Sequence, residues 1–558
     1  MKRDLSIRRN AAALAALTLA ASLGASAARA ADNAQTTTVT TTNAAANAPA
    51  NTRANAATNS TATSASKPTA RQTHKSKRKA ARKRSSQAAQ QSMQQSAPPT
   101  ASNHQAQSVE PLLAPNAPEI LASASPAQSA NETVRADNPP RAQSSQAASK
   151  GFVDDGHLTL NLRNYADMLD VEGGPHRHAW VQGAMLDYTS GFTQGPIGLG
   201  VDASLYGAFK LDGGQGAGNM VHVAKGGGGS NQLAWAYPGI YDVKARVSDT
   251  VVKYGLQVVD DNPFFEPHDN RALPPTFLGV SLVSKDIANV VLQGGSFTKV
   301  DARGHTNLTD LTTSYGGVSF KRFSYAGGRW DYSPNGSLSL FANQADGVWR
   351  QYYGSLQQSI GDPSTLKWTG FANIYSTHSV GGGAEGPIDN NAYSVSLAAQ
   401  HGAHSLLFGF QQILGDQFFD YVNETNGIYL VNSMDVDYNA PHEKSFQVRY
   451  GFDGKYAGLP GAKAMLWYAL GWGADASAGA AANASPNSAL YGLYWRNGQP
   501  VHGTHHEFGF IPSYTVQSGR FKDTKISFIA MWHHGSQYYS DPSNMEYRLV
   551  VGMPLKLF

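Results

Sequence analysis

The amino-acid sequence predicts an all-β fold, a transmembrane antiparallel β-barrel that follows a disordered N-terminal extension. Three observations support this prediction. The 22 Phe, 25 Tyr and 9 Trp residues all lie from Phe152 onward. Apolar and polar side chains alternate in short runs throughout that part, and the last run ends on an aromatic residue, Phe558. Because a chain without aromatic residues buries too little surface to offset its conformational entropy, we expect residues 150–558 to hold the folded domain.

The first 30 residues have the organisation of a secretory signal peptide. An apolar run from Ala11 to Leu23 precedes a small-x-small site over residues 28–30, and basic residues open the chain: Lys2, Arg3, Arg8 and Arg9. This order predicts export and cleavage after Ala30. The apolar run is shorter than the roughly 20 residues that a membrane-spanning helix needs, so a retained anchor is the weaker interpretation.

Residues 31–149 are expected to form a disordered, low-complexity segment in the periplasm. Their composition is dominated by Ala, Ser, Thr, Asn, Gln and Pro, with a basic cluster from Lys75 to Arg84. Like charges at that density repel one another and keep a chain extended. Two interpretations of the cluster stay open, a solvated tail and electrostatic docking to an anionic polymer of the cell envelope.

The charge balance differs between the two parts of the chain. Of 44 Lys and Arg and 40 Asp and Glu residues, 18 and 6 fall in residues 1–150, which leaves 26 basic and 34 acidic residues in the remainder. The part that is expected to fold is therefore acidic, although the whole chain has a formal net charge of +4. An acidic domain disfavours nucleic acid as a partner.

Alternation with a period of two predicts strands within residues 150–558. The side chains on the apolar side of these strands are expected to face lipid: Leu158, Leu160 and Leu162, then Val243, Ala245 and Val247, then Phe446, Val448, Tyr450 and Phe452, and finally Tyr547, Leu549, Val551 and Met553. The cations on the opposite side are expected to point inward: Arg163, Lys244, Arg246, Arg449 and Arg548.

A soluble β-sandwich also alternates, so further features are needed to favour a membrane barrel. Many aromatic residues stand near the predicted strand ends, where barrels place their interfacial girdles. The polar faces carry long charged side chains, which suit a water-filled lumen better than a packed core. With strands of about 9–11 residues, this part of the chain accommodates roughly 16–18 strands around an aqueous channel.

A series of ordered sequence blocks extends over residues 151–558: Trp180–Gly195 with Gly198–Asp202, then Lys244–Ser248, Val252–Gly255, Arg271–Pro274, Ile428–Ser433, Val516–Gly519 and Pro554–Phe558. In these blocks the chain resembles the OprD-like (porin D) family of outer-membrane porins. The resemblance implies a monomeric 18-stranded barrel in the outer membrane of a Gram-negative bacterium, with loops folded inward to form a narrow eyelet. It also implies a passive, substrate-selective channel for small polar solutes such as amino acids, small peptides and carboxylate-bearing compounds.

An eyelet selects solutes by replacing part of their hydration with fixed charges of both signs. The resemblance places Arg271 at the constriction and assigns Asp416, Asp420 and Tyr421 to an acidic constriction loop. The inward wall cations named above join this candidate site, and Arg350, in a less regular run, is assigned to the same group. For each residue the alternative is a solvated wall charge that is paired for folding.

One departure from the family pattern bears on selectivity. Ser527 and Ile529 stand where the family commonly has two arginines at alternate positions of its penultimate strand. Part of the basic ladder that guides carboxylates is then missing, which weakens the expectation of strict carboxylate selectivity. Together with the acidic balance of the domain, this favours cationic or zwitterionic solutes.

Other functional classes find little support in the sequence. Cysteine is absent, and no Gly-x-Ser-x-Gly elbow, His-Glu-x-x-His motif or phosphate loop is present. Neighbouring residues of a strand face opposite ways, so His505-His506 and His533-His534 do not form metal sites as pairs, and no cofactor is expected. A barrel hydrolase and a non-transporting receptor or adhesin remain the alternatives. The expected partners besides solutes are outer-membrane lipid and, through the strand that ends in Phe558, the barrel assembly machinery.

Overall fold

The computed structural model describes residues 143–174, 176–211, 236–259 and 261–558. The predicted signal peptide, the basic cluster from Lys75 to Arg84 and most of the predicted extension lie outside the described residues. Within the described part, no helix combines the length and the hydropathy needed to cross a membrane.

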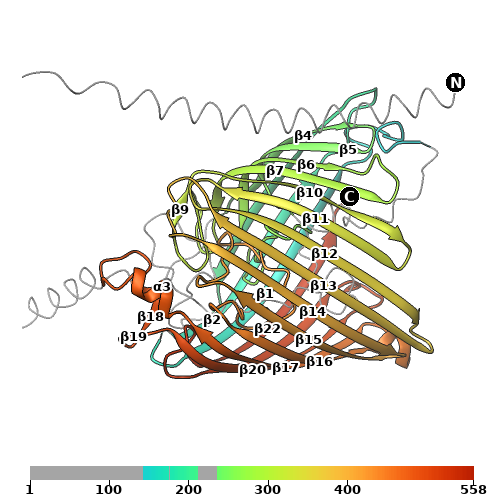
Figure 1. Cartoon of the computed structure of the whole chain (residues 1–558). Helices are drawn as coiled ribbons and strands as arrows, with labels where there is room; N and C mark the ends of the chain where they lie inside the picture. The colour runs from blue at the N-terminus through green and yellow to red at the C-terminus, as the bar shows by residue number, and fades with distance from the viewer. Residues whose placement is uncertain (1–142, 175, 212–235, 260) are drawn as a thin grey trace, which may run out of the picture. The chain divides into compact units, whose positions relative to one another are not determined.

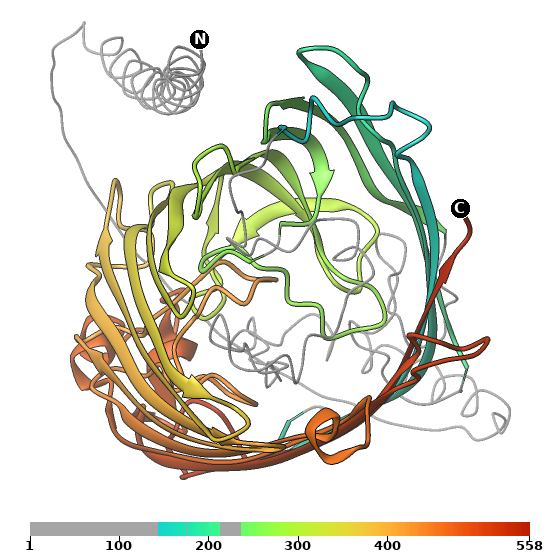
Figure 2. The ribbon, with the colours of Figure 1, turned by 90° about the vertical axis from the view of Figure 1, so that its right-hand side faces the viewer.

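Eighteen antiparallel strands of the described part form a closed barrel (Figures 1 and 2). They are β1 (His157–Val171), β2 (His176–Thr189), β3 (Gly198–Lys210), β4 (Tyr237–Val247), β5 (Thr250–Gln257), β6 (Thr276–Ser284), β7 (Val290–Asp301), β10 (Phe323–Ser333), β11 (Gly336–Ala345), β12 (Trp349–Asp362), β13 (Leu366–Ser379), β14 (Asp389–His401), β15 (His404–Leu414), β16 (Lys444–Asp453), β17 (Ala462–Asp475), β20 (His502–Thr515), β21 (Lys525–Gly535) and β22 (Asn544–Lys556). The predicted all-β transmembrane barrel is thereby confirmed.

Smaller elements lie in the connections between barrel strands. They are β8 (Leu308–Thr312), β9 (Ser319–Phe320), β18 (Trp495–Arg496), β19 (Gln499–Pro500), the 3-10 helix η2 (Gly454–Ala457) and the short helices α3 (Ser477–Ala482) and α4 (Tyr491–Tyr494). β8 pairs with the end of β7 and with β9, so this part of the sheet continues beyond the barrel wall.

The first and last strands close the ring. β1 pairs with β2 on one side and with β22 on the other, and Leu160 lies opposite Leu555 in the second pairing. β22 continues in register past Pro554, which lies opposite Asn161. The barrel therefore has no free edge strand. An open edge would leave backbone N–H and C=O groups without partners in hydrocarbon.

Burial alternates along the strands as the sequence predicted. In β1, Asn161, Arg163, Tyr165 and Asp167 are buried, whereas the leucines of 158–162 are only half-buried. In β16 the buried residues include Arg449 and not its apolar neighbours. This pattern fits an apolar outer face against lipid and a polar inner face.

The two ends of the barrel differ in the length of their connections. Short turns such as residues 248–249 and 402–403 lie at one end, where β1 begins and β22 finishes. The other end carries the long loops 258–275, 302–322 and 415–443. Outer-membrane barrels have short periplasmic turns and longer extracellular loops, so the short-turn end faces the periplasm.

These three long loops fold into the ring (Figure 2). Their apolar side chains, Phe264, Phe265, Tyr421 and Ile428 among them, are buried against inward residues of the wall such as Phe297. The hydrophobic core is thus built between the loops and one sector of the wall. The inward folding that the family resemblance implied is present.

Residues 143–149 pack across the periplasmic end of the barrel. The backbone N–H of Gln146 donates to the carbonyl of Ser248 at 3.0 Å. Its side-chain amide donates to the carbonyls of Thr193 and Gly195 at 2.9 and 3.0 Å. The sequence predicted disorder as far as residue 149, whereas residues 143–149 make these defined contacts with the barrel. Composition did not show the contact because it depends on a few polar groups, such as the Gln146 amide, that meet turns far away in the chain.

Candidate functional site

One loop is fixed to the barrel wall by Arg163. This residue points inward from β1 and holds Asp269 of the 258–275 loop through two bonds, Nη1 to Oδ1 at 2.6 Å and Nη2 to Oδ2 at 2.8 Å. Its Nη1 also donates to the carbonyl of Arg271 at 2.8 Å, and the hydroxyl of Tyr165 donates to the carbonyl of Asn270 at 2.8 Å. Such bidentate Arg–carboxylate pairs fix geometry strongly. The wall cation thus positions residues 269–271.

Arg271 lies inside this arrangement and is 1% exposed. Its Nη1 donates to the carbonyl of Asn270 at 2.8 Å. Burial, followed by repulsion from the guanidinium groups of Arg177, Arg303 and Arg548, lowers the pKa of Arg271 to about 9. Guanidinium groups therefore gather around Arg271, the residue that the sequence analysis assigned to a constriction.

Two of those guanidinium groups belong to a buried network of the wall. Arg177 of β2 bonds to Asp167 of β1 and, through Nη2, to Oε1 of Glu546 at 2.7 Å. Arg548 donates from Nη2 to Glu546 at 2.8 Å. The third, Arg303 of the 302–322 loop, pairs with Glu424 of the 415–443 loop at 2.6 Å. Cations therefore hold strands and loops together on this side of the lumen.

Carboxylates join the other two loops. Asp420 of the 415–443 loop is 4% exposed, and its oxygens accept the backbone N–H groups of residues 314–316 at 2.8–3.0 Å. It also accepts the backbone N–H of Tyr421 at 2.7 Å. The Tyr421 hydroxyl donates to Asp437 at 2.7 Å. Asp420 and Tyr421, which the sequence assigned to the constriction, thus lie together inside the barrel.

Other predicted site residues lie away from this constriction. Lys244 points inward from β4 and pairs with Asp202 at 2.6 Å. Arg246, on the same face, donates from Nε to Gln146 at 3.0 Å at the periplasmic end. Asp416 has a side chain that is 54% exposed and pairs with His442 at 2.9 Å, apart from Asp420. Arg449 faces inward from β16 and is 7% exposed.

Arg350 requires a correction, because the structure places it on the outer face of β12. Its neighbours Trp349 and Gln351 are buried, whereas Tyr352 and Leu356, which share its face, are each 48% exposed. The guanidinium donates to Gln344 at 2.8 Å. The inward assignment was wrong because the run Trp349–Tyr353 has aromatic residues on both faces, so hydrophobicity does not reveal its register.

Several charged residues in and beside the surroundings of Arg271 were missed by the sequence analysis. Arg177 lies between His176 and His178 at the start of β2. The two histidines face outward together and bond to Asp170 at 2.8 and 3.1 Å, which leaves Arg177 on the inner face. The alternation of Arg177 with buried Ala179 and Val181 was the available signal. Arg303 and Glu424, in irregular loops, had none.

A chain of buried hydrogen bonds joins the 415–443 loop to the last strands. His533 Nδ1 lies 3.0 Å from the carbonyl oxygen of Pro542, which can only accept, so this nitrogen carries a proton. With His533 neutral, its Nε2 accepts from His505 Nδ1 at 3.0 Å. His505 Nε2 in a neutral ring then accepts from Glu443 at 2.7 Å, and the Tyr539 hydroxyl donates to the other Glu443 oxygen at 3.0 Å. Neutral histidines here require a protonated Glu443.

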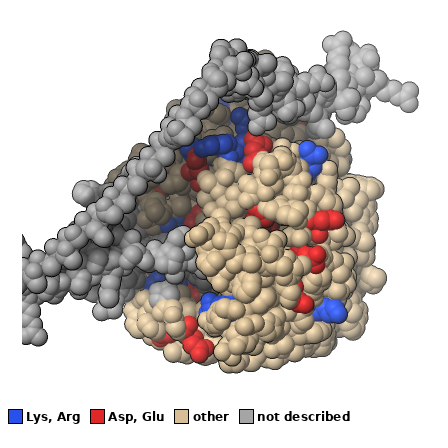
Figure 3. Space-filling view, turned by 60° about the vertical axis from the view of Figure 1, so that its left-hand side comes forward, with Lys and Arg blue, Asp and Glu red and all other residues tan. Residues whose placement is uncertain are grey.

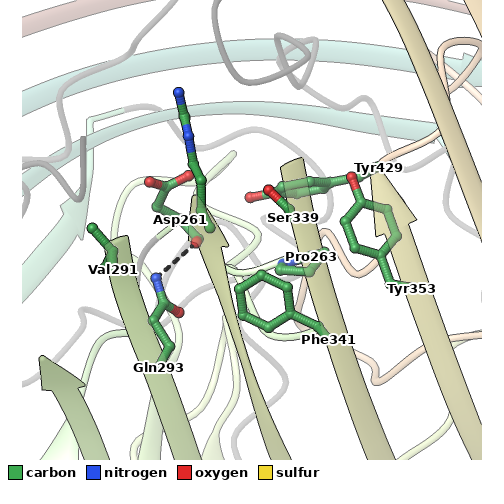
Figure 4. Close-up of a pocket in the computed structure, with 9 residues that line it drawn as sticks. Asp261, Pro263, Val291, Gln293, Ser339, Phe341, Tyr353 and Tyr429 are labelled. Atoms are coloured by element: carbon green, nitrogen blue, oxygen red, sulfur yellow. Dashed lines mark hydrogen bonds between the residues drawn. The ribbon is translucent and has the colours of Figure 1, made fainter. Parts of the chain in front are cut away.

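A small recess lies where the loops meet the inner wall (Figure 4). Phe341 and Tyr353 of the wall and Pro263 of the loop provide its apolar side, and Asp261 and Tyr429 provide polar groups. The Gln293 amide donates to the carbonyl of Asp261 at 3.1 Å. Side chains of both signs also lie in the hollow of the face shown in Figure 3. The lumen therefore presents acidic, basic and aromatic groups beside one another.

A closed transmembrane barrel with inward-folded, charged loops has the construction of an outer-membrane channel. Residues 150–557 match the sequence model of the outer membrane porin, OprD family. Porin D of Pseudomonas aeruginosa is 34% identical over 433 residues, which cover 74% of this chain and 94% of that protein. The porin-like protein GalP of Pseudomonas putida is 29% identical over 74% of this chain and 95% of its own length.

Solved structures agree with these sequence relationships. The crystal structure of Pseudomonas aeruginosa OccD3 (OpdP) has 34% identity and a TM-score of 0.65, covering 75% of this chain and 95% of that one. That of Pseudomonas aeruginosa OpdK with vanillate has 26% identity and a TM-score of 0.63, covering 73% and 100%. The chain belongs to the OprD family of outer-membrane porins. It is a substrate-specific channel of the bacterial outer membrane and not an enzyme, so the hydrolase alternative is not favoured.

Proposed function

We propose that this channel selects small cationic or zwitterionic solutes that carry a carboxylate, and that selection takes place between Arg271 and the loop of Asp420. The observation that carries the proposal is the presence of both residues inside the barrel, on loops that come from different parts of the chain. A zwitterion such as an amino acid offers one group to each side. Fixed charges of both signs replace part of its hydration.

The basic side of this pair favours a solute carboxylate. Burial, followed by repulsion from three nearby guanidinium groups, lowers the pKa of Arg271. A carboxylate brought to this point would relieve that repulsion, as an opposite charge does for any buried ion. The related OpdK was crystallised with vanillate, an aromatic carboxylate.

The acidic side favours a cationic group. Asp420 belongs to the inward-folded 415–443 loop and accepts the backbone N–H groups of residues 314–316. Ser527 and Ile529 of β21 supply no positive charge to the wall. The acidic balance of the domain acts in the same direction, although charges across a wide lumen are screened within about 8 Å at physiological salt.

The remaining partners are proposed from the sequence. The barrel acts as a monomer, and the strand that ends in Phe558 is recognised by the barrel assembly machinery. The basic cluster from Lys75 to Arg84 docks to an anionic polymer of the envelope, for which its density of positive charge is suited. A non-transporting receptor would have a lumen closed to ions.

Reversal potentials of the purified full-length protein in a planar bilayer test the proposal. Under a salt gradient, wild type should prefer cations, and Arg271→Ala should increase that preference while reducing block by benzoate more than block by arginine. Lys244→Gln is the matched control, because it removes an inward cation away from the constriction. A wild-type preference for anions, or equal effects of both substitutions, would contradict the proposal. Absence of conductance would favour the receptor.

A further inference from the structure

The outer surface of the barrel carries a group of exposed cations at its extracellular end. Lys299 extends from β7, Lys321 and Arg322 precede β10, and Arg350 lies near the start of β12. We call these four residues the basic rim. None of them serves the constriction, because they lie on the side of the wall that faces away from the lumen.

Strand register shows that these residues share the outer face. Lys299 lies opposite Leu278 and Asp310, while its neighbour Val300 is buried in the core. Arg322 directly precedes Phe323, which is fully buried, so alternation turns Arg322 outward. One outward row runs across Ser296, Ser324, Gln344 and Arg350, on strands β7, β10, β11 and β12. At about 4.8 Å per strand, this row is roughly 15 Å long.

The cations of the basic rim exceed their carboxylate partners. Lys299 and Lys321 share one carboxylate, Asp310, and their side chains are 41% and 82% exposed. Arg350 donates from Nε and Nη2 to the amide oxygen of Gln344, and within the described part no ion pair of Arg350 is found. The guanidinium therefore keeps donors free on an open surface, where its planar fork suits phosphate.

The position of the basic rim relative to the apolar outer face points to the membrane interface. Along β12 the outward residues after Arg350 include Tyr352, Leu356 and Ile360, with exposures of 48%, 48% and 70%. From Arg350 to Ile360 a tilted strand rises by roughly 25 Å, which is the height of the apolar band in such barrels. Arg350 therefore lies at the extracellular edge of that band, at the level of lipid headgroups.

The rest of the extracellular rim has a different chemistry. Its outward ionisable groups include His–Asp pairs, such as His176 with Asp170 at 2.8 Å and His378 with Asp389 at 3.2 Å. His442 with Asp416 is a third such pair. These pairs carry no excess positive charge at neutral pH. Lys444, at the extracellular start of β16, is exposed in another sector, whereas the four cations of the basic rim lie together from β7 to β12.

We propose that the basic rim binds the phosphate groups of an anionic lipid in the outer leaflet. Lys299, Lys321, Arg322 and Arg350 would contact phosphate oxygens while the acyl chains lie along the apolar face below Tyr352. Cations near a membrane surface each contribute modestly to such binding, and their effects add. This inference goes beyond transport, since it concerns how the wall is held in its lipid.

Native mass spectrometry of the delipidated full-length protein tests this proposal. The probe is bis-phosphorylated lipid A, compared with the same glycolipid after dephosphorylation. Lys321→Gln combined with Arg350→Gln should lower the affinity for the phosphorylated probe by about tenfold or more, at about 1 kcal/mol per removed cation. The dephosphorylated probe should bind wild type and this variant equally, and inorganic phosphate at the same concentration should not compete.

The control variant combines Lys444→Gln with Lys455→Gln, which removes two exposed cations from another sector. It should bind the phosphorylated probe as wild type does. Equal loss in both double variants would show that only net charge matters, and an unchanged affinity of the rim variant would overturn the proposal. Competition by inorganic phosphate would show a site for the free ion instead. Both variants should retain wild-type conductance, so failure here is distinguishable from failure of the proposed transport function.

Discussion

At the scale of single residues, Glu443 is the clearest case in which geometry and titration coincide. Its carboxyl group is buried among His505, Tyr539 and the backbone N–H of Ala440. Burial raises the pKa of Glu443 to about 8, above its ordinary value of 4.5. With both histidines neutral, the hydrogen-bond directions traced from the carbonyl of Pro542 fit the same protonated acid.

Glu443 is therefore predicted to make the folded protein less stable as pH rises. The folded state binds the proton more tightly than the unfolded state, so this contribution is complete below about pH 4.5 and is lost as pH rises through about 8. As pH rises from about 5 to 8, the free energy of unfolding of wild type should fall by more than about 1 kcal/mol relative to that of Glu443→Gln. The amide of this variant imitates the protonated acid and does not titrate. Urea unfolding at both pH values measures this, and parallel pH profiles would contradict it.

Two aspartates of one loop provide a second prediction at this scale. Asp420→Asn should lower the cation-to-anion permeability ratio and, because an amide accepts fewer N–H groups than a carboxylate, should also make the open-channel current noisier. Asp416→Asn should change neither, since Asp416 is half-exposed at the rim beside His442. Single-channel recordings in a salt gradient compare the two. Equal shifts would mean that the charge of the loop acts as a whole and not from one position.

At the scale of elements, the alternation of apolar and polar side chains with a period of two predicted most of the strand orientations. It oriented β1, β4, β16 and β22 because their two faces differ in polarity over many residues. It failed for Arg350 of β12, where Tyr352 faces outward and Tyr353 inward, so that both faces look alike. It could not address the loops, since the burial of Phe264 or Ile428 depends on contacts with strands far away in the chain. Arg271 and Asp420 came from family resemblance alone.

β16 offers a direct test of its two faces. Val448→Lys should destabilise the barrel by roughly 2–4 kcal/mol, because the new charge would lie in hydrocarbon near the middle of the strand. Arg449→Ser, one residue further on, should cost far less, because Arg449 faces the interior and its Nη1 has no hydrogen-bond partner in the described part. Unfolding from lipid vesicles measures both. Similar losses of stability in the two variants would contradict the assignment of Val448 to the outer face and Arg449 to the inner face.

At the scale of the whole molecule, the bonds of residues 143–149 to the barrel predict where an N-terminal deletion begins to lower stability. Deleting residues 31–142 should leave a β-rich, heat-modifiable barrel that inserts into bilayers. Extending the deletion to residue 149 removes the bonds of Gln146 to Ser248, Thr193 and Gly195, and should lower stability by about 1–3 kcal/mol. Electrophoretic heat-shift curves compare the two proteins. Failure of the shorter deletion to fold would show that the extension is needed for the barrel.

The pairing of β1 with β22 also predicts an order of assembly. Every other wall contact joins strands that are neighbours along the chain, whereas this one joins the first strand to the last and has the largest loop-closure entropy. Consecutive hairpins can therefore form early, and ring closure comes last. Until the 13 residues of β22 are in place, β1 and β21 are open edges whose N–H and C=O groups hydrocarbon cannot satisfy. The final strand decides whether the membrane receives a sealed wall or a sheet prone to aggregation.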